Sequence, residues 1–416
     1  MSKRDDVLIV GGGVIGLASA LALLDAGRSV RVLEATRVGA GSSHGNCGTI
    51  TPSHAAPMAA PGSVARALKW MLTPDAPFYL KPRLDPTLWR WLLGFASHCN
   101  PRDWAAAMRA RSTILSASRA MLPEWIARYA LDCEFAEDGV DYVFRQAAGL
   151  QRLTDELPAL SALGIAAEVI DGADYVRSEP AVRDGVIGVV RFPGDARLRP
   201  DRYVAELARA VRAAGGTIEE GCEVTAIGSD RDGVAVGSPL GSRRARDVLL
   251  ATGAWSPLLA KAAGLARIPV QPGKGYSITY DAPALVPRRP LSLYERSVCV
   301  TAWDSGFRLG STMEFSGYDT TLNRRRLDAL ERGAAEYLHA PVGPVKREEW
   351  FGWRPVSVDD VPIIGRALGH PHVWLATGHG MLGVSMSTGT GQLVADLLCA
   401  RTPHFDPKPY SPERFA

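Results

Sequence analysis

A short unit near the start of the chain limits the possible folds more than any other feature. The apolar run VLIV at residues 7–10 is typical of a buried parallel strand, and GGGVIG follows directly at residues 11–16. Apolar residues then recur at helical spacing up to Gly27, and VRVL at residues 30–33 forms a second strand that ends at Glu34. Strand, glycine turn, helix and strand within about 30 residues predict a βαβ unit.

The glycines and the acidic residue of this unit indicate a dinucleotide-binding site. Gly11 permits a tight turn out of the strand, Gly13 lets the backbone approach a pyrophosphate, and Gly16 lets the helix pack close to the sheet. The helix N-terminus offers unpaired N–H groups to the phosphates. Glu34, which lies 18 residues after Gly16, is placed to bind the ribose hydroxyls. The alternative, a tight turn with a surface glutamate, does not explain why strand, helix and acidic residue occur together.

The rest of the chain predicts one doubly wound sheet that is interrupted by insertions. The run DVLLATGAWS at residues 247–256 is typical of a buried strand that ends in a glycine turn, and residues 373–399 follow a strand, turn, helix pattern. Residues 64–131 have mostly helical patterns, and residues 276–315 alternate like an antiparallel meander. We therefore predict an α/β fold, a doubly wound Rossmann-like nucleotide-binding domain with an inserted α+β substrate domain that contains an antiparallel sheet. The predicted boundaries assign residues 1–80, 191–265 and 351–416 to the first domain and 81–190 and 266–350 to the second.

Three further loops of small residues favour FAD over NAD as the dinucleotide. They are GSSHGNCG at residues 41–48, TGAWS at residues 252–256 and TGHGMLG at residues 377–383. A reduced flavin carries negative charge near N1 and O2, and the last of these loops is expected to open a helix whose N-terminus suits that charge.

Composition and cysteine spacing exclude several other classes. The formal net charge is only +3, from 47 basic and 44 acidic residues, which argues against a nucleic-acid partner. The cysteines at residues 47, 99, 133, 222, 299 and 399 are at least 34 residues apart, so we expect free thiols and no metal site. No signal peptide or membrane-spanning stretch is visible, which predicts a cytoplasmic protein.

At this point the chain resembles a known family, the D-amino-acid dehydrogenases, within the wider group of FAD-dependent enzymes related to D-amino-acid oxidase and glycine oxidase. The resemblance covers nearly the whole length. It is carried by the segments VLIVGGGVIGLASALAL, GSSHGNCGTITPSHAAPMAAPG, LLATGAWS, GKGYSIT, FRLGSTMEF, GWRPVSVDDVPIIG and ATGHGMLGVSMSTGTGQLVADL.

The resemblance implies an extended FAD with its adenosine near the first βαβ unit. The pyrophosphate and ribose would be held by Gly11, Gly13, Val14, Ile15, Gly16, Glu34 and Ala35, with Val224 against the adenine. The flavin would be lined by Ser42, Ser43, Asn46 and Gly48. Its pyrimidine edge would be covered by Gly378, His379, Gly380, Met381, Leu382 and Gly383, and the further cofactor-binding residues are Thr252, Gly253 and Trp255.

The resemblance also suggests candidates on the substrate side. Arg308 and Arg354 lie where relatives carry basic residues, and an arginine fork suits a substrate carboxylate. His54 lies in a loop expected near the flavin, and Tyr276 is expected either to face the pocket or to pack in a core. Some distant relatives link FAD covalently to a histidine at the position of His44, and closer relatives lack one there.

The implied reaction is oxidation of the Cα–N bond of a D-amino acid by hydride transfer to flavin N5, which gives an imine. Cyclic substrates such as D-proline or hydroxy-D-proline are included. Two alternatives stay open: an oxygen-using oxidase of the glycine or sarcosine type, and a non-catalytic FAD-binding subunit. No Ser/His/Asp or paired-carboxylate set is visible, which fits an amine that loses its proton on binding.

The segment from residue 55 to 104 has two interpretations. Its tryptophans (Trp70, Trp89 and Trp91) are interleaved with Lys69, Lys81, Arg83 and Arg90, a pattern that suits peripheral contact with a membrane. The resemblance implies a purpose for contact with the inner membrane, because related dehydrogenases pass electrons to membrane quinones. The same spacing is also typical of the core of a helical subdomain.

Overall fold

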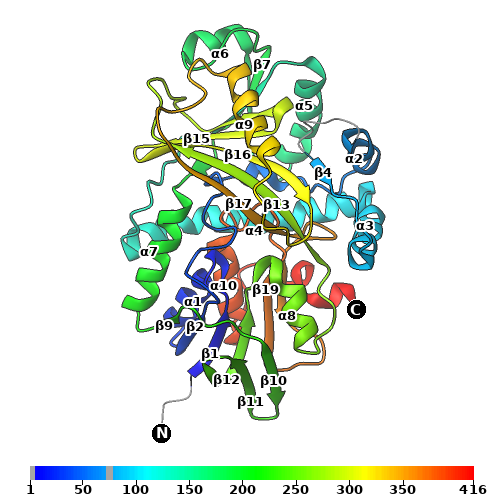
Figure 1. Ribbon diagram of the computed structural model, residues 1–416, viewed down its shortest axis with the longest axis vertical. Helices are drawn as coiled ribbons and strands as arrows, with labels where there is room; N and C mark the ends of the chain where they lie inside the picture. The colour runs from blue at the N-terminus through cyan, green and yellow to red at the C-terminus, as the bar shows by residue number, and fades with distance from the viewer. Residues whose placement is uncertain (1–4, 72–77) are drawn as a thin grey trace.

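The computed structural model describes residues 5–71 and 78–416, whose strands form two large sheets. The two sheets lie one above the other, and the described N-terminus is at the lower end (Figure 1). The strands β3 (Thr49–Ile50) and β8 (Ala196–Arg197) form a separate two-stranded sheet.

The first sheet has eight strands and the strand order of a doubly wound fold. Its five parallel strands lie in the order β9-β2-β1-β12-β19, which is 3-2-1-4-5 when they are numbered along the chain. The antiparallel strands β10, β11 and β18 extend it. The bounds are β1 Asp5–Val10, β2 Val30–Leu33, β9 Thr217–Glu219, β10 Ala226–Asp230, β11 Gly233–Ser238, β12 Gly241–Leu250, β18 Ile363–Arg366 and β19 Val373–Thr377.

The register of this sheet aligns the ends of its central strands. Val10 at the end of β1 pairs with Leu33 of β2 on one side and with Leu250 of β12 on the other. Leu250 in turn pairs with Leu375 of β19. Residues that are far apart in sequence therefore leave the sheet at one edge, at the point where the strand order reverses and ligands bind in folds of this kind.

The second sheet is mixed and has nine strands, most of them antiparallel. Its order is β17-β13-β16-β15-β14-β5-β7-β6, with β4 paired to β16. The bounds are β4 Phe78–Leu80, β5 Val140–Phe144, β6 Glu168–Asp171, β7 Gly188–Phe192, β13 Val270–Tyr280, β14 Leu291–Leu293, β15 Val298–Trp303, β16 Gly306–Phe315 and β17 Lys346–Ser357. The predicted fold class is thus confirmed.

Helices cover both sheets. Below the second sheet α1 packs on α10 and α7, and α10 packs on α4, while α9 packs on β13, β15 and β16 (Figure 1). The helices are α1 Val14–Asp25, α2 Ser63–Met71, α3 Pro86–His98, α4 Pro101–Tyr129, α5 Ala147–Ser161, α6 Gly172–Ser178, α7 Pro200–Ala213, α8 Ser256–Ala262, α9 Arg324–Tyr337 and α10 Ser387–Leu398. Short 3₁₀ turns are η1 Pro52–Ala55, η2 Gly253–Trp255, η3 Tyr294–Arg296, η4 Lys408–Tyr410 and η5 Pro412–Phe415.

Local signals explain where α3 and α4 begin. Each starts with a proline at its first position, and each is preceded by a side chain that caps the helix. The carboxylate of Asp85 accepts hydrogen bonds from the N–H groups of Thr87 and Leu88, and the amide oxygen of Asn100 accepts one from Asp103.

Three local features differ from the sequence prediction. The loop at residues 377–383 does not open a helix directly, because turns occupy residues 383–386 and α10 begins at Ser387. Strand β4 lies before the predicted boundary at residue 80 yet pairs in parallel with β16 of the second sheet. Strand β17 crosses the predicted boundary at residue 350 without a break. The division of the chain into two domains made of five segments stays a prediction, and its exact boundaries are not marked by the ends of strands.

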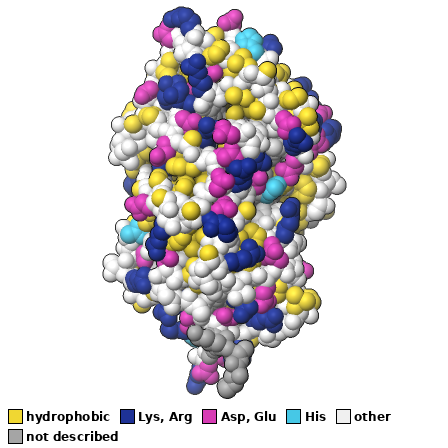
Figure 2. Space-filling model, turned by 90° about the vertical axis from the view of Figure 1, so that its left-hand side faces the viewer, with side chains coloured by type: hydrophobic (Ala, Val, Ile, Leu, Met, Phe, Trp, Pro, Cys, Tyr) yellow, Lys and Arg dark blue, Asp and Glu magenta, His cyan; other side chains and the backbone are white. Residues whose placement is uncertain are grey.

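One face of the molecule carries basic, acidic and apolar side chains interspersed, without a broad patch of one sign of charge (Figure 2). Within the described residues, no helix is both long and apolar enough to cross a membrane.

Candidate functional site

A cavity of about 2050 Å³ lies between the edge of the first sheet and the second sheet. This volume is about twice the upper end of the range for ordinary small-molecule pockets, roughly 300–1,000 Å³. All the predicted cofactor-binding residues line it except Gly16 and Gly378, and so do His54, Tyr276 and Arg354. We call the part lined by residues 10–15, 33–36 and 222–225 the nucleotide end, and the part lined by His54 and the second sheet the substrate end.

The nucleotide end is made mainly of backbone. The carboxylate of Glu34 accepts a hydrogen bond from the N–H of Gly12 at 2.7 Å, and another from the N–H of Thr36 at 3.0 Å. These bonds hold the turn after β1 against the end of β2. Gly16 does not face the cavity, because it packs against the turn: a Cβ there would lie 2.0 Å from the carbonyl oxygen of Gly11. Gly16 therefore acts through helix packing, as predicted from the motif.

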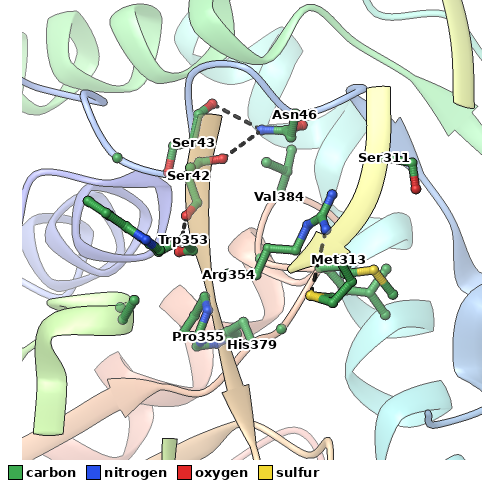
Figure 3. A pocket seen from close by; sticks show the side chains of 18 of the residues that line it. Ser42, Ser43, Asn46, Ser311, Met313, Trp353, Arg354, Pro355, His379 and Val384 are labelled. Atoms are coloured by element: carbon green, nitrogen blue, oxygen red, sulfur yellow. Dashed lines mark hydrogen bonds between the residues drawn. The ribbon is translucent and has the colours of Figure 1, made fainter. Parts of the chain in front are cut away.

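The loop after β2 closes over the N-terminus of α1. Gly13 has no side chain to cap this helix, and the hydroxyl of Ser43 accepts the hydrogen bond of the Val14 N–H at 3.0 Å instead. The hydroxyl of Ser42 donates to the backbone carbonyl of Trp353 in β17 (Figure 3). The amide of Asn46 donates to the carbonyls of Ser42 and Ser43. The loop thus joins the two sheets along the wall of the cavity.

The C-terminal loop supplies the opposite wall. His379 is buried, and its Nε2 lies 3.0 Å from the hydroxyl of Thr390 in α10. Burial lowers the pKa of His379 to about 3, so the imidazole is neutral and serves as a packing and hydrogen-bonding group.

Arg354 is the charged group of the substrate end. It extends from β17 towards β16, where its Nη1 donates to the carbonyl of Thr312 and lies 3.8 Å from the sulfur of Met313 (Figure 3). A Cβ on Gly275 of the neighbouring strand would lie 2.4 Å from the guanidinium carbon, so only glycine leaves room for it. Burial lowers the pKa of Arg354, but a guanidinium stays cationic at neutral pH. Among the described residues no carboxylate pairs with it.

The backbone beside Arg354 is strained. Ser311 and Thr312 have φ values of 135° and 60°, where non-glycine residues are uncommon. They lie where the pairing between β13 and β16 shifts register, next to Tyr276. This irregular stretch carries the Thr312 carbonyl that accepts from Arg354.

Arg308 was predicted beside Arg354 as a carboxylate anchor, and the structure does not bring it into the cavity. Its side chain is 1 % exposed and donates to the hydroxyl of Thr279 and to the carbonyls of His44 and Asn46. In a β-strand neighbouring side chains point to opposite faces, and this one points into the loop that Ser43 belongs to. Through these bonds Arg308 holds the loop at residues 42–48 against the second sheet.

Tyr276 and His44 also differ from their simplest predicted roles. The ring of Tyr276 contributes to the lining, but its hydroxyl points away and donates to Glu314 at 3.3 Å. His44 lies outside the main cavity and is 2.8 Å from the carboxylate of Glu348. This position does not suit a covalent link to a group in the cavity.

Sequence reasoning missed several residues of the substrate end. Tyr142 of β5 pairs with Ser292 of β14, and Ser292 pairs with Cys299 of β15. These three side chains therefore share one face of the sheet, and all three line the cavity. Gly310, the partner of Cys299, leaves room for the sulfur of Cys47. A hydrogen bond with Cys299, helped by the charges of Arg308 and Arg354, lowers the pKa of Cys47. No motif marks these residues, because only strand pairing brings them together.

The residues of the nucleotide end fit FAD. The helix α1 begins beside the cavity and its first N–H groups have no partner within the helix, which suits a pyrophosphate. The Oε2 atom of Glu34 keeps one lone pair free for a ribose hydroxyl, because the other acceptor sites are taken by Gly12 and Thr36. The indole nitrogen of Trp353, a residue that lines the cavity, is buried without a hydrogen-bond partner among the described residues.

Comparison with known proteins agrees with this geometry. Residues 6–397 match the family model described as FAD dependent oxidoreductase (DAO). A D-amino acid dehydrogenase from Granulibacter bethesdensis is 32% identical over 421 residues, which cover 99% of each chain. A glycine oxidase from Geobacillus kaustophilus superposes with a TM-score of 0.76 at 23% identity, covering 99% of this chain and 98% of that one. An FAD-bound L-α-glycerophosphate oxidase from Mycoplasma pneumoniae superposes with a TM-score of 0.74 at 18% identity, covering 95% of both chains.

The glycine turn at residues 11–16, the cavity beside it and these similarities agree on one assignment. The chain belongs to the DAO family of FAD-dependent oxidoreductases, among the relatives of the D-amino acid dehydrogenases, and its cofactor is FAD.

Proposed function

We propose that this protein oxidises the Cα–N bond of D-amino acids to an imine. The observation that carries the proposal is Arg354, a cation that faces the cavity without a carboxylate partner among the described residues. A buried cation is stabilised only when an anion or several acceptors satisfy it, and the α-carboxylate of an amino acid matches the guanidinium fork. The D configuration rests on the names of the relatives.

The residues of the cavity divide the work of binding. The turn at residues 11–16, Glu34 and the loop at residues 42–48 would hold FAD. Bound FAD supplies the acceptor for the hydride that leaves the substrate Cα. Arg354 fixes the carboxylate, and the irregular stretch at Ser311 and Thr312 holds the guanidinium in place. A fixed carboxylate orients the Cα–H bond, which is the main contribution a protein makes to such a reaction.

The substrate class includes cyclic amino acids such as D-proline and hydroxy-D-proline. A secondary amine next to a carboxylate presents the same two groups to Arg354 and to the flavin. The apolar side chains of Trp91, Met313 and Phe315, all along the cavity lining, suit the carbon atoms of such a ring.

Denaturation and anaerobic reduction test this function. We expect the purified protein to release FAD, and its flavin absorbance to bleach with D-amino acids faster than with their L enantiomers, glycine or sarcosine. Faster bleaching by glycine or sarcosine, with oxygen consumption, would assign an oxidase of that type. FAD without bleaching by any of these compounds would assign a non-catalytic subunit.

We further propose that electrons leave to a quinone at a membrane surface. Leu84, Trp89 and Leu93 are 101%, 54% and 73% exposed at α3 and the turn before it, and Trp89 also lines the cavity. Lys81 and Arg90 lie on the same segment and are exposed. Trp91 instead packs in a buried apolar cluster, as the alternative interpretation predicted, and the side chain of Trp70 lies outside the described residues.

Vesicles that contain anionic lipid test the membrane proposal. We expect co-sedimentation at low salt that is lost in the double variant Trp89→Ser, Leu93→Ser, whose changes are both on the exposed face of α3. Full recovery of the unaltered protein in the supernatant would contradict the proposal.

A further inference from the structure

A chain of four side chains leads from the cavity into the protein interior. The Nδ1 atom of His54 lies 2.6 Å from the hydroxyl of Tyr142, and that hydroxyl lies 3.4 Å from the hydroxyl of Ser53. The hydroxyl of Ser53 donates to Asp195 at 2.5 Å, and the Ser53 N–H donates to the other carboxylate oxygen at 3.1 Å. Every link joins two groups that can both donate and accept a proton, or ends at a carboxylate.

At the cavity end, His54 cannot store a proton. It lines the cavity, and among the described residues nothing hydrogen-bonds to its Nε2. Arg111 donates to the backbone carbonyl of His54 at 2.8 Å. Burial, reinforced by the charge of Arg111, lowers the pKa of His54 to about 4. A proton that arrives at this imidazole near neutral pH must therefore move on or return.

At the inner end, Asp195 is a base without a cationic partner. It is 1% exposed, and none of the described residues forms an ion pair with it. Burial raises the pKa of Asp195 to about 7, and the hydrogen bonds from Ser53 offset this only in part. The cation whose charge acts on this carboxyl is Arg119, and its guanidinium is already held by Glu137 and by the carbonyl of Gly194.

Among the described titratable groups beside this chain, Asp195 is the one that can accept a proton near neutral pH. Burial holds the pKa of Tyr142 well above its ordinary value, so this phenol stays protonated and only passes protons on. The buried side chain of Asp360 is occupied by Arg111. The groups that face the chain are Arg111 from α4 at His54, Cys299 from β15 and Tyr294 from η3 at Tyr142, and Arg119 from α4 at Asp195.

We propose that Asp195 takes up the proton that the substrate ammonium group releases in the cavity, and that His54, Tyr142 and Ser53 carry it there. The proposal rests on the proposed function, because it assumes an amino-acid substrate. It explains how a cavity that already holds the cation of Arg354 makes the neutral amine from which the hydride leaves.

The transfer moves one proton and no electrons. The ammonium N–H breaks as its proton binds Nε2 of His54, and the imidazole releases the Nδ1 proton to the oxygen of Tyr142. Tyr142 passes its own hydroxyl proton to Ser53, and Ser53 passes its proton to Asp195, which becomes a neutral carboxylic acid. The reverse transfers return the proton when the product has left. His54 is the catalytic residue of the four, because its Nε2 takes the proton from the substrate; Tyr142, which also lines the cavity, Ser53 and Asp195 act through His54 and are positioning residues.

Asp195→Asn tests the inner end, because the amide keeps the shape and cannot take up the proton. We expect the rate of anaerobic flavin reduction at about pH 7 to fall on the order of a hundredfold, the low end of the usual range for a general base. The loss should disappear at alkaline pH, where the free substrate is already a neutral amine. The acid limb of kcat/KM should accordingly move from near 7 towards the pKa of the substrate ammonium. An unchanged pH profile would overturn the proposal.

Tyr142→Phe tests the middle of the chain, and the chain offers a matched control. Tyr142→Phe should shift the pH profile as Asp195→Asn does, and the double variant should be no slower than either single variant, because both cut one path. Tyr175 is also buried, and its hydroxyl donates to Asp141 at 2.8 Å away from the cavity. Tyr175→Phe should leave the pH profile unchanged. Additive losses in the double variant would contradict a shared path.

Infrared difference spectroscopy tests the chain without turnover. We expect the holoenzyme to show a protonated-carboxyl band that titrates near pH 7 and is missing from Asp195→Asn. If no D-amino acid reduces the flavin but this band is present, the proposed function fails while the buried acid stands. If D-amino acids do reduce the flavin and either the band or the shift of the pH profile is absent, the relay is overturned.

Discussion

The two ends of the cavity are built from different parts of the chain and in different ways. The nucleotide end comes mainly from one continuous stretch, in which the N–H of Gly12 donates to the carboxylate of Glu34 and the N–H of Gly11 donates to the carbonyl of Leu33. The substrate end is assembled from η1, β5, β15, β16 and β17, and its side chains come from positions as far apart as His54 and Arg354. At the nucleotide end a change of backbone shape should abolish FAD binding and with it the oxidation of every substrate, whereas at the substrate end single side chains should set rate and specificity.

Gly16→Ala at the nucleotide end should have the largest effect on activity, because it should remove the cofactor. The added Cβ would lie 2.0 Å from the carbonyl oxygen of Gly11, which is backbone and cannot move away. We expect the loss of bound FAD and a decrease in the free energy of unfolding of about 3 kcal/mol, as for overpacked cores.

Gly194→Ala is the control for Gly16→Ala, because its Cβ would meet nothing within 4 Å. It should keep both the flavin absorbance and the melting temperature. A Gly16→Ala variant that is stable and still binds FAD would contradict the claim that the nucleotide end depends on the shape of its backbone.

Asp195→Asn should change how stability depends on pH. Burial raises the pKa of this carboxyl from its ordinary value of 3.8 to about 7, so the folded protein binds the proton more tightly than the unfolded chain does. This contribution is fully present below about pH 4 and is lost as the pH rises through about 7. The shift of about three pKa units corresponds to about 4 kcal/mol.

Denaturant unfolding at several pH values measures this linkage. The free energy of unfolding of Asp195→Asn, relative to the unaltered protein, should rise between about pH 4 and pH 7 and level off above that. A difference that stays constant with pH would mean that Asp195 does not titrate in this range.

Arg308→Met separates the two arginines that the sequence could not tell apart. The carbonyls of His44 and Asn46 would lose their buried donor, which should decrease the free energy of unfolding by about 2 kcal/mol. We expect KM for the amino acid to change by less than about threefold, since Arg308 does not line the cavity. A large rise in KM with unchanged stability would make Arg308 the anchor after all.

The same contrast explains what the sequence could predict. The motif of residues 11–16 with Glu34 predicts the first sheet and the nucleotide end, because strand, turn and helix are local and have a fixed spacing. Arg354 could be proposed from its segment, but the placement of Arg308 depends on which face of β16 meets the loop at residues 42–48.

Tyr142, Asp195 and the pairing of Cys47 with Cys299 could not be predicted from the sequence. Tyr142 and Cys299 come together only through the order of strands in the second sheet, where β14 pairs in parallel with β5 although about 150 residues separate them. Asp195 and Cys47 lie in loops whose contacts no local pattern indicates. The start of α10 at Ser387 was also missed, since a run of small residues gives no capping signal.

The smallest effect should come from His44→Gln. His44 pairs with Glu348 at 2.8 Å and is about a quarter exposed, so its loss should change stability by less than about 1 kcal/mol. FAD should be released by acid from both the variant and the unaltered protein. Flavin that stays on the unaltered chain after denaturation, and is released from the variant, would show a covalent link.

One thermodynamic cycle tests the central claim that Arg354 binds the substrate carboxylate. The rate of anaerobic flavin reduction is measured for the unaltered protein and for Arg354→Ala, each with a D-amino acid and with the matching amine that lacks the carboxylate. We expect Arg354→Ala to lower kcat/KM for the amino acid by about a hundredfold, which corresponds to about 3 kcal/mol, while FAD stays bound. The amine should be a poor substrate for both proteins and should be affected by less than about threefold. Equal losses with the amino acid and the amine would show that Arg354 does not contact the carboxylate and would contradict this assignment of the substrate end.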